Sequence, residues 1–245
     1  MRSRLFAIVA VVSVVAGLSA ASAGQAVART YQPAKAPPQV SGAKLLVALL
    51  PASAFGDTFY IGGWRYTARM LSPNRHPVSV KRLSCTSFEN SAIISGFGNT
   101  SGATDQFANT NPWPGYPETI FYGYQTVLQF ASDGAAASFF AQARAKYAGC
   151  RSYTVPNPGN GVPGGGSYLA NLLSVTSARV GHDRGFAAVE TIALSQRPGI
   201  TLYLDVMYAT AGTNVYEVWQ ISGTNDQTSH MSGLISRVRA LYSRR

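Results

Sequence analysis

The sequence predicts an α+β domain in which an antiparallel β-sheet carries two amphipathic helices on one face. Three observations lead to this prediction: a strand-to-helix unit around residues 119–148, four strand-like segments between residues 172 and 222, and an apolar-striped segment at residues 228–242. Short polar or Gly/Pro connections join the four strands, so we expect them to pair antiparallel. Strands and helices in this order are typical of α+β domains.

The N-terminus has the features of a secretory signal. Met-Arg-Ser-Arg precedes an apolar run from Leu5 to about Leu18, followed by the small-residue sites Ala21-Ser22-Ala23 and Ala26-Val27-Ala28. The run is short for a membrane span of about 20 residues. We therefore expect residues 1–28 to be a cleaved signal peptide and the protein to be secreted or associated with the cell envelope, with an uncleaved anchor as the alternative.

The next segments predict a tether and then the start of the domain. Residues 29–43 are rich in Pro, Ala and polar residues, which is typical of a flexible linker. Residues 44–245 form the predicted domain, which opens with a short helix at 44–54 that Pro51 ends or restarts. Residues 57–118 contain many turn signals between short strands or helical turns, with a short helix expected over Cys85–Ile94.

The strand-to-helix unit is the clearest part of the chain. Thr119–Ala131 is rich in aromatic and β-branched residues, which predicts a long strand. Ser132 or Asp133 then caps a helix, and Gly149 is expected just beyond its end. Residues at helical spacing form one apolar face, namely Ala136, Phe139, Phe140, Ala143 and Tyr147.

The remaining elements are four strands and a final helix. The strands are expected at residues 172–180, 185–194, 200–209 and 214–222. In the third strand the alternation puts one set of residues on one face (Ile200, Leu202, Leu204, Val206, Tyr208) and a second set on the other (Thr201, Tyr203, Asp205, Met207). The helix at 228–242 has a predicted buried stripe of Met231, Leu234, Ile235, Val238 and Tyr242.

Cys85 and Cys150 are the two cysteines of the chain. In an oxidising compartment such a pair is most simply a disulfide. It would close a loop of about 66 residues and contribute about 4 kcal/mol in a chain-entropy description. Two free thiols or half of a metal site are the alternatives, but two cysteines without nearby histidines supply too few ligands for zinc. We expect no metal and no cofactor.

Catalytic motifs do not emerge from the sequence. No G-x-S-x-G elbow is present, and His76, His182 and His230 lie in a loop, a hairpin turn and a helix start. The glycine-rich segment 157–167 lacks the G-K-[ST] of a phosphate loop. The net charge is +10, yet no nucleic-acid-binding motif is found, so no nucleic acid is expected as a partner. We predict that the protein is not an enzyme.

Basic residues gather in the N-terminal third of the chain. Positive charge there could attract an anionic envelope polymer or lipid headgroups, or it could be an ordinary solvated surface. The residues are Lys44, Arg65, Arg69, Arg75, Lys81 and Arg82.

Polar side chains on the predicted strands are the candidate ligand contacts. Glu190, Asp205 and Glu217 lie on three consecutive strands and could meet on the open face of the sheet, where paired carboxylates could serve glycoside hydrolysis. Alternatively they face solvent and pair with Arg179, Arg184 or Arg197. Amide and aromatic side chains suit polar ligands, which adds Gln125, Gln129 and Tyr203 to the candidates.

The strand-to-helix unit also carries a family resemblance. Val127-Leu128-Gln129-Phe130-Ala131-Ser132, then Ala136-x-x-Phe139-Phe140, then Cys150 resembles the extracellular sensor domain of mycobacterial PknH-type serine/threonine kinases, which also occurs in stand-alone exported proteins of actinobacteria. Leu49-Leu50-Pro51 and the closing helix fit as well, so the resemblance covers roughly residues 44–243.

The resemblance implies a strongly curved antiparallel sheet with both helices on its convex side and a ligand cleft on its concave side. The sequence departs from the family in having two cysteines instead of four, and it contains neither a kinase domain nor an internal transmembrane helix. We therefore expect a monomeric, non-catalytic sensor-type domain that binds an unidentified cell-envelope or extracellular ligand, with a membrane receptor as a possible partner. A structural or protein-interaction module of the envelope and an envelope hydrolase are the alternative functions.

Overall fold

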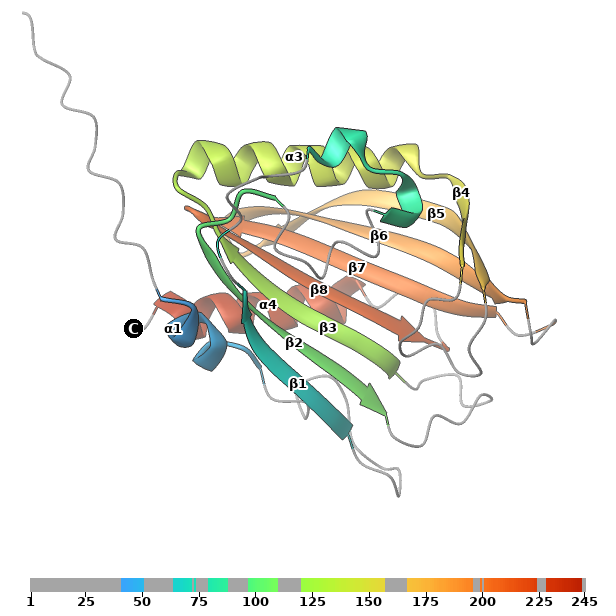
Figure 1. Cartoon of the computed structure of the whole chain (residues 1–245), viewed down its shortest axis with the longest axis horizontal. Helices are drawn as coiled ribbons and strands as arrows, with labels where there is room; N and C mark the ends of the chain where they lie inside the picture. Colours follow the sequence, from blue (N-terminus) through green and yellow to red (C-terminus); the bar gives the residue numbers. More distant parts are fainter. Residues whose placement is uncertain are drawn as a thin grey trace, which may run out of the picture. The chain divides into compact units, whose positions relative to one another are not determined.

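An antiparallel sheet organises the part of the chain that the computed structural model describes, which is residues 41–50, 64–71, 73, 79–87, 97–109, 120–156, 167–195, 199, 201–223 and 228–243. All of these residues belong to one compact unit, Ala36–Arg245. The sheet has eight strands in the order β1-β2-β3-β8-β7-β6-β5-β4 (Figure 1). The strands are β1 (Trp64–Leu71), β2 (Ser101–Asn109), β3 (Ile120–Gln129), β4 (Ser152–Val155), β5 (Tyr168–Val180), β6 (Asp183–Leu194), β7 (Thr201–Ala211) and β8 (Asn214–Ser222).

Helices cover both faces of this sheet. They are α1 (Gly42–Val47), the 3-10 turn η2 (Val80–Arg82), α3 (Asp133–Gly149) and α4 (Thr228–Ser243). The long helix α3 buries Phe139 and Tyr147 in one core cluster, which includes Tyr208 of β7. Helices α1 and α4 belong to a second core cluster (Figure 1). The strand residues of this second cluster alternate along β7 and β8 with those of the first. Because successive side chains of a strand point to opposite faces, the two long helices lie on opposite sides of the sheet.

The α+β class and the antiparallel sheet are confirmed, but the prediction that both helices share one face is wrong. The reason lies in β8, whose nine residues are all buried. In β7 the apolar side chains of Leu204 and Val206 face α3, whereas Met207 belongs to the opposite cluster. A strand buried on both faces needs cover on both faces, which two helices on a single face could not supply.

Several predicted elements are confirmed in detail. The strand expected at 119–131 is β3, and the four later strands are β5 to β8, with β5 beginning earlier than expected, at Tyr168. The final helix is α4, and the predicted stripe residues Met231, Leu234, Ile235 and Val238 are buried. The Ser132 side chain caps α3 by accepting a hydrogen bond from the backbone N–H of Ala135 at 3.2 Å.

Other predictions need correction or fall outside the described residues. Helix α3 ends at Gly149, one residue later than expected, and Cys150 is its C-cap. The first helix ends at Val47, before Pro51. Residues 85–87 of the helix predicted over Cys85–Ile94 are helical, and residues 88–94 lie outside the description, as do residues 1–40 with the predicted signal and most of the linker.

None of the helices in the described part of the chain has both the length and the apolar character needed to cross a membrane.

The predicted disulfide between Cys85 and Cys150 is confirmed, with 5.6 Å between the two Cα atoms. It joins the end of α3 to the irregular segment that contains η2. Two further contacts fasten the same segment: the Lys146 ammonium donates to the carbonyl of Leu83, and the Thr86 hydroxyl donates to the carbonyl of Thr154 at 2.9 Å. The disulfide therefore fixes a segment with little regular structure against the helix.

We expect the double change Cys85→Ser and Cys150→Ser to lower the free energy of unfolding by about 4 kcal/mol, because the unfolded chain regains the freedom of a loop of about 66 residues. Urea denaturation of the oxidised protein and the variant measures the difference. Reduced wild-type protein is the control and should match the variant. A difference below about 1 kcal/mol would contradict the stabilising role.

We expect Ser132→Ala to lower the free energy of unfolding by about 1 kcal/mol, because the N–H of Ala135 loses its capping acceptor. Ser132→Asp, which keeps an acceptor oxygen, should restore most of the loss. Ser138→Ala, an exposed serine within the same helix, is the matched control. Equal effects at positions 132 and 138 would show that the cap does not contribute.

Candidate functional site

The carboxylates that the sequence singled out are buried within the sheet. Glu190 and Asp205 are 0% exposed and Glu217 is 3% exposed. Glu190 and Glu217 share the face that α3 covers, since they lie opposite Leu204 and Tyr208 of β7. Asp205 is an odd number of positions from both of these β7 residues, so its side chain projects to the other face. The structure therefore does not bring the three acids together.

The two glutamates that share a face are also far apart. They lie on the two strands that flank β7 and are offset by four residues along it, which places their Cα atoms roughly 16 Å apart. Tyr153 of β4 donates to Glu190 at 2.7 Å, and Tyr124 of β3 donates to Glu217 at 3.3 Å. The geometry does not support a glycosidase pair.

Glu217 is the centre of a buried polar group beneath α3. Its Oε1 accepts from the hydroxyls of Tyr208 at 2.6 Å and Tyr124 at 3.3 Å. Burial raises the pKa of Glu217 to about 8, while the two tyrosine hydrogen bonds oppose that rise. Burial, followed by the proximity of Glu217, also raises the pKa of Tyr208 well above its usual value. At neutral pH Glu217 is mainly protonated, which suits a structural role in the core.

The predicted amide contacts hold parts of the chain together. Gln125 accepts from the backbone N–H of Leu50 at 2.9 Å and donates to the carbonyl of Leu50 at 2.6 Å, so it ties the segment after α1 to β3. Gln129 accepts from the Ser101 hydroxyl at 3.1 Å. Tyr203 is half-buried near the start of β7, on the same face as Asp205. Their role as ligand contacts stays a prediction, and burial of the two glutamines leaves little room for it.

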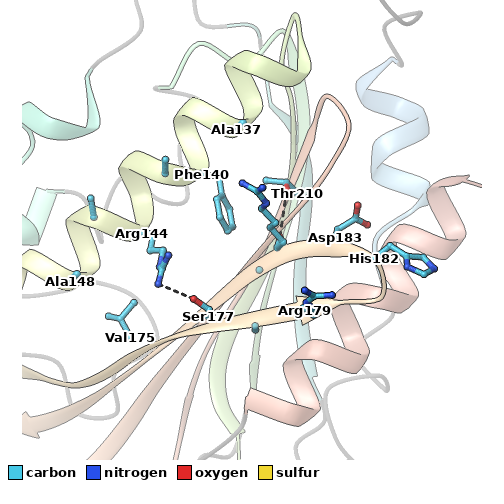
Figure 2. A pocket seen from close by; sticks show the side chains of 15 residues that line it. Ala137, Phe140, Arg144, Ala148, Val175, Ser177, Arg179, His182, Asp183 and Thr210 are labelled. Atoms are coloured by element: carbon cyan, nitrogen blue, oxygen red, sulfur yellow. Dashed lines mark hydrogen bonds between the residues drawn. The ribbon is translucent and has the colours of Figure 1, made fainter. Parts of the chain in front are cut away.

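A groove lies elsewhere, between α3 and the hairpin formed by β5 and β6 (Figure 2). Its volume is about 910 Å³, near the upper end of the range for small-molecule sites. The helix contributes a row of small side chains: Ala137, Ala141, Ala145 and Ala148. Phe140 and Val175 add apolar surface. The spacing of the alanines places them on one side of the helix, where they leave space above the hairpin.

Basic side chains line the same groove. Arg144 extends from α3 toward β5, where it donates to the Ser177 hydroxyl at 2.9 Å (Figure 2). Arg179 of β5 and Arg184 of β6 are direct cross-strand partners, and both line the groove. Pairing of the strand acids with these arginines, the alternative that the sequence offered, is not found among the described residues, where Glu190 and Glu217 bind tyrosines.

The acidic residue of the groove is compensated from the other side of the sheet. Arg239 of α4 pairs with the Asp183 carboxylate and also donates to the carbonyl of Val180. Gly181 makes this approach possible: its φ is +64°, and a Cβ there would collide with the Arg239 guanidinium. Helix α4 therefore fixes the turn that carries one rim of the groove.

Sequence reasoning missed this groove, although two signals for it were present. The alanines recur at helical spacing within residues 137–148, and Arg179 and Arg184 flank a short hairpin turn symmetrically. The sequence pattern does not specify where α3 lies relative to β5, and the groove depends on that position. Neither this groove nor either of two smaller ones, which lie beside α3 in the described part of the chain, includes any of the six predicted contacts.

Within the described residues, no group of three or more His, Cys, Asp or Glu side chains is placed to hold a metal ion.

Comparison with known proteins places the fold. No family model matches the chain, and no curated protein matches it by sequence. The structure is similar to the crystal structure of the extracellular domain of PknH from Mycobacterium tuberculosis, with a TM-score of 0.56 over 84% of this chain and 98% of that domain. The predicted resemblance to the PknH extracellular domain is confirmed. At 13% sequence identity, this similarity concerns the fold.

We expect the stability of the wild type to fall as the pH rises from about 5 to 8, because folded Glu217 keeps a proton that the unfolded chain releases. Glu217→Gln, which cannot titrate, should flatten this dependence by up to about 1.4 kcal/mol per pH unit. Urea denaturation at several pH values measures both slopes. The change Asp133→Asn at an exposed carboxylate is the control. Equal slopes for wild type and Glu217→Gln would contradict the assignment.

Proposed function

We propose that this protein is an exported, non-catalytic, sensor-type domain that binds a small cell-envelope or extracellular ligand in the groove between α3 and the β5–β6 hairpin. The groove carries the proposal, because it combines a ligand-sized volume, an apolar wall and convergent basic side chains. The fold, which is similar to that of an extracellular domain, agrees with the export signal predicted from the N-terminus. A disulfide also suits an oxidising compartment.

The arrangement of the acids supports binding over catalysis. General acid–base chemistry needs a titratable group within reach of a substrate, whereas Glu190 and Glu217 are buried and bonded to tyrosines. His182 lines the groove next to Asp183, but that carboxylate is engaged by Arg239. We propose a membrane receptor as the partner to which such a domain would report occupancy.

Differential scanning fluorimetry tests the site. The probes are a neutral disaccharide, a muropeptide and dodecyl phosphate, each titrated into the whole chain. We expect at least one of them to raise Tm, and the rise to disappear in Ala141→Phe, because a ring on that wall fills the groove.

Ser138→Phe is the matched control, since Ser138 is exposed on the other flank of α3, and it should keep the response. A folded protein whose Tm responds to none of the probes would contradict the proposal. So would a response that Ala141→Phe leaves unchanged.

A further inference from the structure

We propose that the ligand of this groove is an amphiphilic anion: a single phosphate, sulfate or carboxylate headgroup bound by Arg144, Arg179 and Arg184, with an apolar tail along the alanine wall of α3. This inference rests on the proposed function and specifies its ligand class.

The arginine pair of the hairpin is the first reason. Arg179 and Arg184 are directly opposite each other on neighbouring strands, and like charges at such positions repel. Both are exposed and line the groove. Within the described residues, neither of them forms an ion pair with a carboxylate. An anion bound between the two guanidinium groups would convert this repulsion into attraction.

Arg144 brings a third guanidinium from the opposite wall. Its hydrogen bond to Ser177 places the Arg144 guanidinium above β5. Ser177 and Arg179 are two positions apart on that strand, so their side chains point to the same face. The guanidinium fork matches phosphate and carboxylate oxygens in a bidentate geometry. Three such groups from two walls of one groove are an arrangement suited to a single compact headgroup.

The net charge of the groove lining also favours an anion. Asp183 is the acid among the residues that line the groove, and the guanidinium of Arg239, which comes from outside the groove, neutralises it. The three arginines therefore give the groove an uncompensated positive field. Because low-dielectric walls focus such a field, an anion should be drawn to this end of the groove.

The apolar wall explains why a tail should accompany the headgroup. Ala137, Ala141, Ala145 and Ala148 follow one side of α3 for about three turns, and each is exposed. Together with Phe140 and Val175 they form a surface that gains free energy when apolar atoms cover it. A fully hydrated ion such as inorganic phosphate would leave this surface and most of the 910 Å³ volume unused.

Isothermal titration calorimetry of the whole chain with dodecyl phosphate, kept below its critical micelle concentration, tests the inference. We expect saturable binding that weakens as salt is raised from about 0.05 to about 0.5 M. Arg144→Gln, Arg179→Gln and Arg184→Gln should each weaken binding about 10- to 100-fold, as expected for loss of a hydrogen bond to a charged group. Inorganic phosphate should bind far more weakly than dodecyl phosphate.

Arg151→Gln is the matched control, because Arg151 is exposed and lies outside the groove. It removes the same charge and should change the affinity by less than about 2-fold. Circular dichroism verifies that each variant is folded. If Arg151→Gln weakens binding as much as the groove variants do, the attraction is unspecific and the inference is wrong.

Two further probes separate the other outcomes. If neutral dodecyl maltoside binds as tightly as dodecyl phosphate and Ala141→Phe abolishes both, the groove is a ligand site but the anionic class is wrong. If no probe of any class binds to the folded wild type, the proposed function fails together with the inference. Binding to vesicles of phosphatidylglycerol, without binding to monomeric dodecyl phosphate, would show that the basic groove contacts a membrane surface and would overturn the single-molecule site.

Discussion

The packing of α3 over the aromatic face of the sheet is the interaction on which the rest of the structure depends. Phe139 lies at the centre of this contact, with ring centroids 4.9 Å from Phe97 and 5.3 Å from Phe130. Deeper in the same face, Phe186 stacks on Tyr208 at 4.9 Å. Aromatic pairs of this kind add to the free energy of simple area burial. The helix thereby closes one core, buries the Glu217 group and provides one wall of the groove.

Cover on both faces of the sheet explains why the polar strand residues are structural. If the face opposite α3 were open, the sheet would present Gln125 and Asp205 to solvent or ligand there. Here α1 and α4 occupy the second face, so each polar group needs a partner inside the protein. Gln125 finds one in the backbone of Leu50. On the other face, beneath α3, Glu217 finds its partners in two tyrosines. Surfaces available for binding therefore lie where a helix ends its contact with the sheet.

The sequence predicted the elements that depend on local pattern. The α3 helix, its Ser132 cap, the hairpins from β5 to β8 and the disulfide follow from periodicity, turn residues and cysteine count. Strands β1 and β2 were not assigned, because they lie in a region crowded with Gly and Pro. Their register comes from long-range pairing, of β2 with β3 and of β1 with β2. The Tyr124–Glu217 contact joins residues 93 positions apart, and no local pattern encodes such a partner.

The groove shows how a site can arise from parts that each have another purpose. The buried Ala136 and Ala143 let the helix lie close to the sheet. The exposed alanines of the same helix, Ala137, Ala141, Ala145 and Ala148, leave space along the groove. The turn after β5 is held by Arg239 from α4, a helix on the far face, which bonds Val180 and Asp183, the residues next to Arg179 and Arg184. A small movement of α4 would therefore shift the turn and with it the two arginines, because packed elements transmit displacement. Under the proposed function, a ligand bound in the groove would be coupled to the position of α4 through this turn, and a domain of sensor type requires such a coupling.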